Sequence, residues 1–120
     1  MYYIEVEKLK QHFPNPICWD GITVTTEDVI ANIEHIKEIE EPFPYQWDIE
    51  KFLNHHKYNK EWHIGRIKYF INHPEKIEPL ELIFEKDEND KEKIKFYDGC
   101  HRFFAHILRN DIMCCYEIKP

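Results

Sequence analysis

Apolar residues follow a helical period in the first third of the chain. Between residues 29 and 39, a valine and four isoleucines recur at the spacing that keeps them on one helix face. This pattern predicts a helix that begins after Thr25 and runs to Glu41, where a proline stops it. The Thr25 side chain can cap the helix, and Asp28 lies near the positive end of the helix dipole.

Two further helices are predicted in the middle third of the chain. Asp48 is the expected N-cap of a short helix. Asn59 begins a longer one, in which Trp62 and Phe70 share an apolar face, and Pro74 closes it.

The last third of the chain shows the two-residue alternation that is typical of strands. Residues 80–84 and 94–96 alternate in this way, which predicts a β-hairpin with the charged run 86–93 as its tip. A turn at 98–99 then leads into a helix that ends at 110–111, where Asn and Asp tolerate left-handed geometry. Further strands are predicted at 2–6, 22–24 and 112–118.

Strands mixed with helices indicate an α/β (α+β) fold, a small mixed β-sheet flanked by helices. The chain has 120 residues, of which 42% are hydrophobic. This length suits one domain, 1–120, with a core large enough to fold without a metal or a disulfide framework.

Charge and residue usage exclude several classes of function. The net charge of −7 makes duplex DNA an unlikely main partner, because phosphate binding needs a concentrated basic footprint. The sequence contains no serine and three glycines, so serine nucleophiles and the common glycine-rich phosphate loops are excluded.

Targeting signals and cysteine spacing point to the cytoplasm. We expect no membrane contact, because the apolar runs are short and the N-terminus lacks the pattern of a signal peptide. The cysteines have no CxxC spacing, so reduced thiols are expected. They are Cys18, Cys100, Cys114 and Cys115.

Candidate chemistry concentrates in the sequence Asp98-Gly99-Cys100-His101-Arg102. A strand, a tight turn and a helix N-terminus direct backbone N–H groups and the helix dipole at one point, which favours an anion. Gly99 permits a positive φ, Arg102 offers a guanidinium fork for phosphate oxygens, and His101 can donate a hydrogen bond or a proton. Asp98 is suited to hold Mg²⁺ or to accept a substrate proton.

Cys100 lies at the predicted helix N-terminus beside His101 and Arg102. This setting predicts a favoured thiolate and makes Cys100 a candidate nucleophile, although small thiols more often serve only for packing. His63 and Arg66 are one helical turn apart and can face one ligand, although such pairs are more often solvent-facing. A zinc site at His55, His56 and His63 is disfavoured, because adjacent histidines diverge on a helix.

The segment 59–118 resembles the ParB/sulfiredoxin-like fold family. The resemblance rests on the strand Ile77-Glu-Pro-Leu-Glu-Leu-Ile-Phe84, a hairpin, the DGxHR-type turn at 98–102, the alanine three residues beyond Arg102, and the preceding helix. Residues 1–58 form a divergent N-terminal half. This resemblance implies a nucleotide-handling protein, since ParB proteins bind CTP, sulfiredoxins use ATP and a related serine kinase branch transfers a phosphoryl group.

Carried over by position, Gly99, Cys100, His101 and Arg102 would contact the phosphates of ATP or CTP with Mg²⁺. His63 and Arg66 are added as further phosphate-binding candidates from their spacing. Asp98 matches the DGxHR branches rather than sulfiredoxin, which has glycine there, and this argues against sulfinic-acid reduction. The leading hypothesis is therefore nucleotide binding, with NTP hydrolysis or phosphoryl transfer as the activity and Asp98, Cys100 and His101 as candidate catalytic residues.

Two alternatives stay open at this point. One is a catalytically inactive accessory or inhibitor protein of phage or mobile-element type, which uses its acidic surface to bind a nucleic-acid-handling protein partner. The other is a ParB-like nuclease, which the net charge disfavours.

Overall fold

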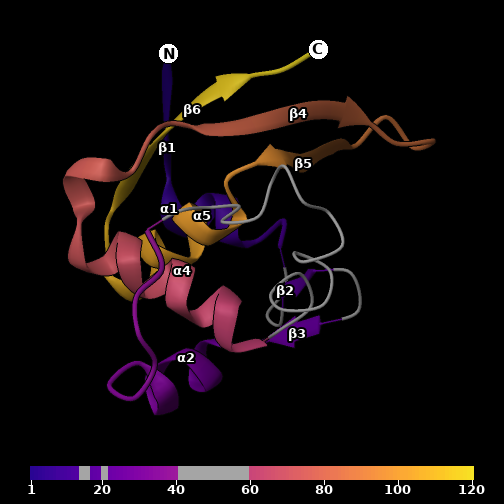
Figure 1. Cartoon of the computed structure of the whole chain (residues 1–120). Coiled ribbons are helices and arrows are strands. Elements are labelled where there is room, and N and C mark those ends of the chain that lie inside the picture. The colour runs from indigo at the N-terminus through magenta and orange to yellow at the C-terminus, as the bar shows by residue number, and fades with distance from the viewer. Residues whose placement is uncertain (14–16, 20–21, 41–59) are drawn as a thin grey trace, which may run out of the picture.

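A four-stranded mixed sheet, with helices packed against it, organises the molecule (Figure 1). The structure is a computed structural model that describes residues 1–13, 17–19, 22–40 and 60–120. The helices are α1 (Val6–Lys10), α2 (Thr26–Asn32), α4 (Lys60–Asn72), α5 (Cys100–Leu108) and the short 3₁₀ turn Pro74–Lys76. The strands are β1 (Tyr2–Glu5), β2 (Ile17–Trp19), β3 (Ile22–Val24), β4 (Leu80–Lys86), β5 (Glu92–Asp98) and β6 (Met113–Ile118).

The main sheet has the strand order β1-β6-β4-β5, and β2 pairs with β3 in a separate hairpin. The β1–β6 and β4–β5 pairs are antiparallel, whereas β4 and β6 run parallel. The expected small mixed sheet flanked by helices is thus confirmed. Figure 1 shows α1, α4 and α5 on the same side of this sheet.

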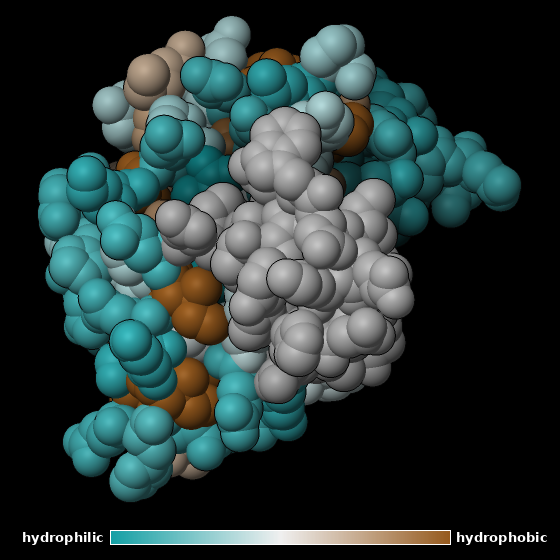
Figure 2. Space-filling model, viewed as in Figure 1, coloured by the Kyte–Doolittle hydropathy of each residue, from teal (hydrophilic) through white to brown (hydrophobic). Residues whose placement is uncertain are grey.

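The β4–β5 hairpin forms where alternation predicts it. Leu80, Leu82 and Ile94 are buried, while Glu85 and Lys95 pair at 3.1 Å on the exposed side. The strands extend beyond the predicted limits, so the tip is confined to residues 87–91. It forms a hydrophilic lobe that projects from the body of the molecule (Figure 2).

Helix α5 lies at the centre of the core, as its two adjacent phenylalanines show. Phe103 packs with Leu9, Leu82 and other apolar side chains between α5 and the sheet. Phe104 packs on the other side of α5 with Ile64 and Ile67 of α4. Because α5 is enclosed by the sheet and by α4, the turn that begins it has a fixed position.

Helix α4 is enclosed more completely than its sequence predicts. The predicted helix is confirmed, and its start at Asn59 falls outside the described residues. One apolar face was expected, but polar His63 and Arg66 are buried together with Trp62 and Phe70. The expectation that this pair more often faces solvent is therefore wrong for this helix.

Helix α2 is much shorter than predicted. The Thr25 cap is confirmed, since its side chain accepts a hydrogen bond from the Asp28 N–H while the Asp28 carboxylate accepts one from Thr25 N–H. The prediction that the helix continues to Glu41 is wrong, because it ends at Asn32. Residues 36–40, here called the strap, instead run across α4.

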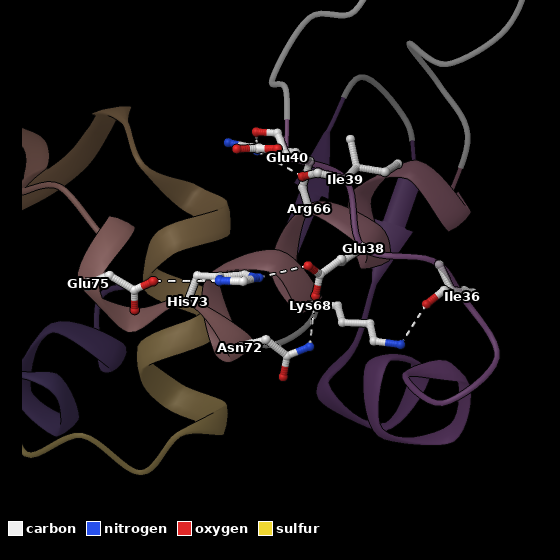
Figure 3. Close-up of polar contacts among 9 residues, drawn as sticks. All are labelled: Ile36, Glu38, Ile39, Glu40, Arg66, Lys68, Asn72, His73 and Glu75. Carbon is white, nitrogen blue, oxygen red and sulfur yellow. Dashed lines mark hydrogen bonds and ion pairs between the residues drawn. The ribbon is translucent and has the colours of Figure 1, made fainter.

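Hydrogen bonds to α4 replace those that a longer helix would have formed. Ile39 N–H donates to the Gly65 carbonyl at 3.0 Å, and Lys68 donates to the Ile36 carbonyl at 2.9 Å. A Cβ at Gly65 would lie 2.7 Å from the Lys37 carbonyl oxygen, so this crossing requires glycine. Figure 3 shows the strap and the α4 side chains that hold it.

The predicted short helix at Asp48 lies outside the described residues, as do His55 and His56. Across the described ranges, no helix combines the length and apolarity that crossing a membrane requires.

Candidate anion-binding site

Gly99 makes the turn between β5 and α5. Its φ is +112°, which confirms the predicted positive φ and is a conformation that other residues rarely adopt. A Cβ there would also lie 3.0 Å from the Leu80 side chain. Gly99 is the N-cap of α5, its carbonyl accepts from Phe103 N–H at 2.8 Å, and no side chain caps this helix end. The helix therefore begins with backbone donors rather than with a capping side chain.

Asp98 lies at the exposed rim of this turn. One carboxylate oxygen accepts a hydrogen bond from Gly99 N–H at 2.8 Å, and the other lies 3.5 Å from Nη2 of Arg102. The Asp98 side chain is 71% exposed. It thus steadies the turn while keeping its oxygens accessible to solvent.

Arg102 is held across the turn by the start of β4. Its Nη1 donates to the Pro79 carbonyl at 2.7 Å, and its side chain is only 12% exposed. This carbonyl fixes the position of the guanidinium group beside Asp98. It also gives Arg102 a structural contact that its place in the motif does not reveal.

His101 pairs with His63 across the contact between α5 and α4. Nε2 of His101 and Nδ1 of His63 are 2.9 Å apart, and the rings lie nearly parallel at 16°. Trp62 meets both imidazoles edge-on. Packing around the ring, followed by the nearby His63, Arg66 and Arg102, lowers the pKa of His101 well below its ordinary value. The His101 ring is therefore neutral at pH 7.

Arg66 lies one turn beyond His63 on α4, and its charge acts on His101. It is only 7% exposed, lies 4.6 Å from the centre of the Phe70 ring, and donates from Nη1 to the strap carbonyls of Ile39 and Glu40 (Figure 3). Its Nε is buried and finds no hydrogen-bond partner in the part of the chain that the structure describes. Burial lowers the pKa of Arg66, Arg102 lowers it further, and Asp98 opposes this shift.

The structure brings together the candidates that the sequence left in two separate segments. His63 contacts His101 directly, and the charge of Arg102 lowers the pKa of Arg66. We call His63, Arg66, His101 and Arg102 the basic cluster. Sequence reasoning missed Trp62 as its aromatic wall, and it missed the carbonyls that hold the two arginines. The three-residue spacing of His63 and Arg66 was the one signal available.

The prediction of a favoured Cys100 thiolate is wrong. Burial, followed by the negative charge of Asp98, raises the pKa of the Cys100 thiol to about 12, although Arg102 opposes this shift. Burial has a larger effect here than the charge of Arg102. Cys100 is thus a neutral thiol, and its contribution to an anion site is its backbone N–H.

The other cysteines whose side chains are described are also free thiols. Cys114 is buried in the core and Cys115 is partly exposed, because successive residues of a strand face opposite sides of the sheet. Burial raises the pKa of Cys114 to about 12.

The donor set at the turn bears on magnesium. Within the described ranges, no three His, Cys, Asp or Glu side chains group as metal ligands. Asp98 offers one exposed carboxylate, and Mg²⁺ commonly takes one or two carboxylates together with phosphate oxygens. The residues present therefore fit a magnesium ion that arrives with a phosphate ligand.

The chain was compared with known protein families, curated proteins and solved structures. No protein-family model, curated protein or solved structure matches this chain.

Proposed function

We propose that this protein binds a nucleotide, ATP or CTP with Mg²⁺, through its phosphates at the turn 98–102. The observation that carries the proposal is the basic cluster, which gathers two guanidinium groups and two imidazoles at an uncapped helix N-terminus with Asp98 beside them. The resemblance of segment 59–118 to the ParB/sulfiredoxin-like family is the reason for proposing a nucleotide as the anion.

Electrostatics favour an anion over a structural role for the cluster. Among the residues that the structure describes, no carboxylate bonds to buried Arg66, and the charge of Arg102 lowers the Arg66 pKa. A buried charge is costly unless it is paired. A phosphate group between the two arginines would offset this cost, and it would accept hydrogen bonds from the first turn of α5.

The proposed roles follow from position. Arg102, Arg66 and the backbone N–H groups of the first turn bind phosphate oxygens, and His101 donates to them with His63 fixing its orientation. Asp98 holds Mg²⁺ at the exposed rim. The ion would neutralise charge on the phosphates during transfer.

Calorimetric titration with ATP, CTP, GTP and ADP, with and without Mg²⁺, tests the binding step. Arg102→Ala is the test variant. Arg109→Ala is its matched control, since Arg109 stands at the other end of α5 and also donates to a backbone carbonyl, that of Ile71 at 3.2 Å. We expect saturable binding that Arg102→Ala abolishes and Arg109→Ala preserves.

No binding at millimolar nucleotide, or equal losses in the two variants, would overturn the proposed site. Hydrolysis is tested separately by phosphate release from the bound nucleotide. There, Asp98→Asn is expected to remove turnover while retaining binding. Continued turnover in Asp98→Asn would remove the metal-holding role of Asp98.

A further inference from the structure

A groove opens at the C-terminal end of α5, away from the basic cluster. It has a volume of about 510 Å³ and lies among β1, α1, α2 and the loop that leads into β6. The lining residues that matter here are Glu5, Glu7, Ile30, Ile107, Leu108 and Ile112. None of them belongs to the proposed nucleotide site.

The groove carries apolar side chains that the core leaves outside. Ile30 is 65% exposed and Ile112 is 80% exposed, while Ile107 and Leu108 are partly buried beneath them. The last strand is predicted to begin at Ile112, but β6 begins one residue later. The Ile112 carbonyl accepts from Val6 N–H at 2.9 Å, so the exposed residue sits on an anchored backbone.

The rim of the groove is acidic. Asp111 is already paired with His106 at 2.9 Å and with Arg109 at 3.2 Å. Glu5 and Glu7 are exposed, and Lys10, which also lines the groove, lies 3.9 Å from Glu7. Any occupant therefore meets apolar side chains beside Glu5 and Glu7, whose negative charge Lys10 offsets only in part.

These observations select one kind of occupant. We propose that the groove docks a basic amphipathic segment of a partner protein, with apolar side chains on Ile30 and Ile112 and with Lys or Arg facing Glu5 and Glu7. Helical segments of this kind bind apolar grooves through side chains spaced by three and four residues. Complementary charge at the rim fixes orientation and favours this partner over acidic ones.

The same charges disfavour the other candidates. Nucleic acid and anionic lipid surfaces would place phosphates against Glu5 and Glu7. A second copy docked symmetrically would bring two acidic rims together, in a chain whose net charge is −7.

A fluorescein-labelled 18-residue peptide of Leu and Lys, with Leu at helical spacing, is the probe for anisotropy titration. A scrambled peptide of identical composition controls for charge. The test variants are Ile30→Glu and Ile112→Glu, whose exposed positions allow the chain to fold. Tyr97→Glu is the control variant, since Tyr97 is also exposed, on β5, and the change adds the same charge.

Non-specific charge attraction and docking in the groove predict opposite effects of the two substitutions on peptide affinity. An added carboxylate strengthens non-specific attraction for a Lys-rich peptide, as Tyr97→Glu will show. Docking in the groove predicts that Ile30→Glu and Ile112→Glu each weaken binding about tenfold, because an apolar contact is lost. It also predicts that the scrambled peptide binds at least tenfold more weakly to the unmodified protein.

Equal binding of the two peptides, or tighter binding by Ile112→Glu, would overturn the proposal and leave only charge attraction. Thermal unfolding of each variant verifies that it is folded. Since the groove is separate from the basic cluster, Arg102→Ala should bind the peptide normally whatever the nucleotide experiment shows.

Discussion

The two ends of α5 differ in the charge and the polarity of the side chains around them. At the N-terminal end, Arg102 lies beside the turn made by Gly99, and its charge lowers the pKa of Arg66. At the C-terminal end, Glu5 and Glu7 border an apolar groove. A helix N-terminus carries partial positive charge and a C-terminus partial negative charge. At the N-terminal end, Arg102 adds to the charge of the dipole. At the C-terminal end, Glu5 and Glu7 add to it, whereas His106 and Arg109 offset it.

The side chains that stabilise α5 are different from those that are proposed to bind ligands at its ends. The helix is held by Phe103 and Phe104, both almost fully buried, so its ends need not be optimal for folding. An arrangement that costs stability in the free protein is typical of a site that a ligand completes. Opposite ligands are expected at the two ends, an anion at one and a basic segment at the other.

The largest effect is expected from a substitution that destabilises α5, the helix that both proposed sites share. Phe103 is fully buried and its ring packs against Phe96 and Phe13. We expect Phe103→Ala to lower the free energy of unfolding by about 3–5 kcal/mol and to weaken both binding activities together. Urea unfolding followed by circular dichroism measures the loss. Phe103→Leu, a smaller change, should retain both activities; if Phe103→Ala spared either one, that end would not depend on α5.

The next largest effect is expected at the N-terminal end of α5 alone. In Gly65→Ala the new Cβ would lie 2.7 Å from the Lys37 carbonyl, so the strap must shift and carry with it the carbonyls that hold Arg66. We expect a loss of about 1–3 kcal/mol in stability. Nucleotide affinity should fall about tenfold, while affinity for the Leu/Lys peptide is unchanged.

Asn72→Ala is the matched control for that strap variant, because it removes only the contact between Asn72 and Glu38. It should leave nucleotide affinity intact. Unchanged nucleotide affinity in Gly65→Ala would contradict a role for Arg66.

A smaller effect concerns pH at the N-terminal end. The pKa of His101 is well below its ordinary value in the free protein, and a bound phosphate would raise it by favouring the charged imidazole. The complex then binds more protons than the free protein, so affinity rises as pH falls from about 7.5 toward 5.5. Titrations in this range measure the trend.

The phosphate itself takes up a proton near pH 6, which acts in the opposite direction. His101→Asn retains that contribution alone. The ratio of the affinities of the unmodified protein and His101→Asn is therefore expected to grow as pH falls. A constant ratio would show that His101 does not contact the phosphate.

The smallest effect lies away from both ends. A hydrogen bond to Glu38 raises the pKa of His73, and Glu38 in turn has a lowered pKa through Asn72 and His73 (Figure 3). Protonated His73 stabilises the fold below its unfolded pKa near 6.5, and this contribution is lost as pH rises through the folded pKa.

Thermal unfolding of His73→Gln measures that contribution. The melting temperature should differ from that of the unmodified protein more at pH 5.5 than at pH 8.5, with nucleotide and peptide binding unchanged. An equal difference at both pH values would contradict the ion pair.

The sequence specifies elements whose signals are local. Gly99 identifies the turn before α5 because only a residue without a side chain suits that φ and the contact with Leu80. Thr25 and Asp28 likewise identify the start of α2. The end of α2 could not be predicted, because Ile36 and Ile39 continue a helical pattern while their backbone groups bond to a helix that lies far along the chain.

The candidate site shows the same limit. Its motif residues at 98–102 could be named from the sequence, whereas the burial of Arg66 depends on the strap. The thiolate expected at Cys100 failed because helix-end electrostatics can be predicted from sequence and desolvation cannot. Burial at α4 and exposure of Ile112 both depend on packing between segments distant in sequence.

The pairing of β1 with β6 has a kinetic consequence. Tyr2 lies opposite Tyr116, so this edge of the sheet joins segments that are far apart in the sequence. Such a contact closes a very long loop, and chains rich in distant pairings fold slowly. During synthesis, β1 leaves the ribosome before β6, which is its partner among the described strands of the sheet. Until β6 follows, the exposed backbone of β1 is open to pairing with other chains.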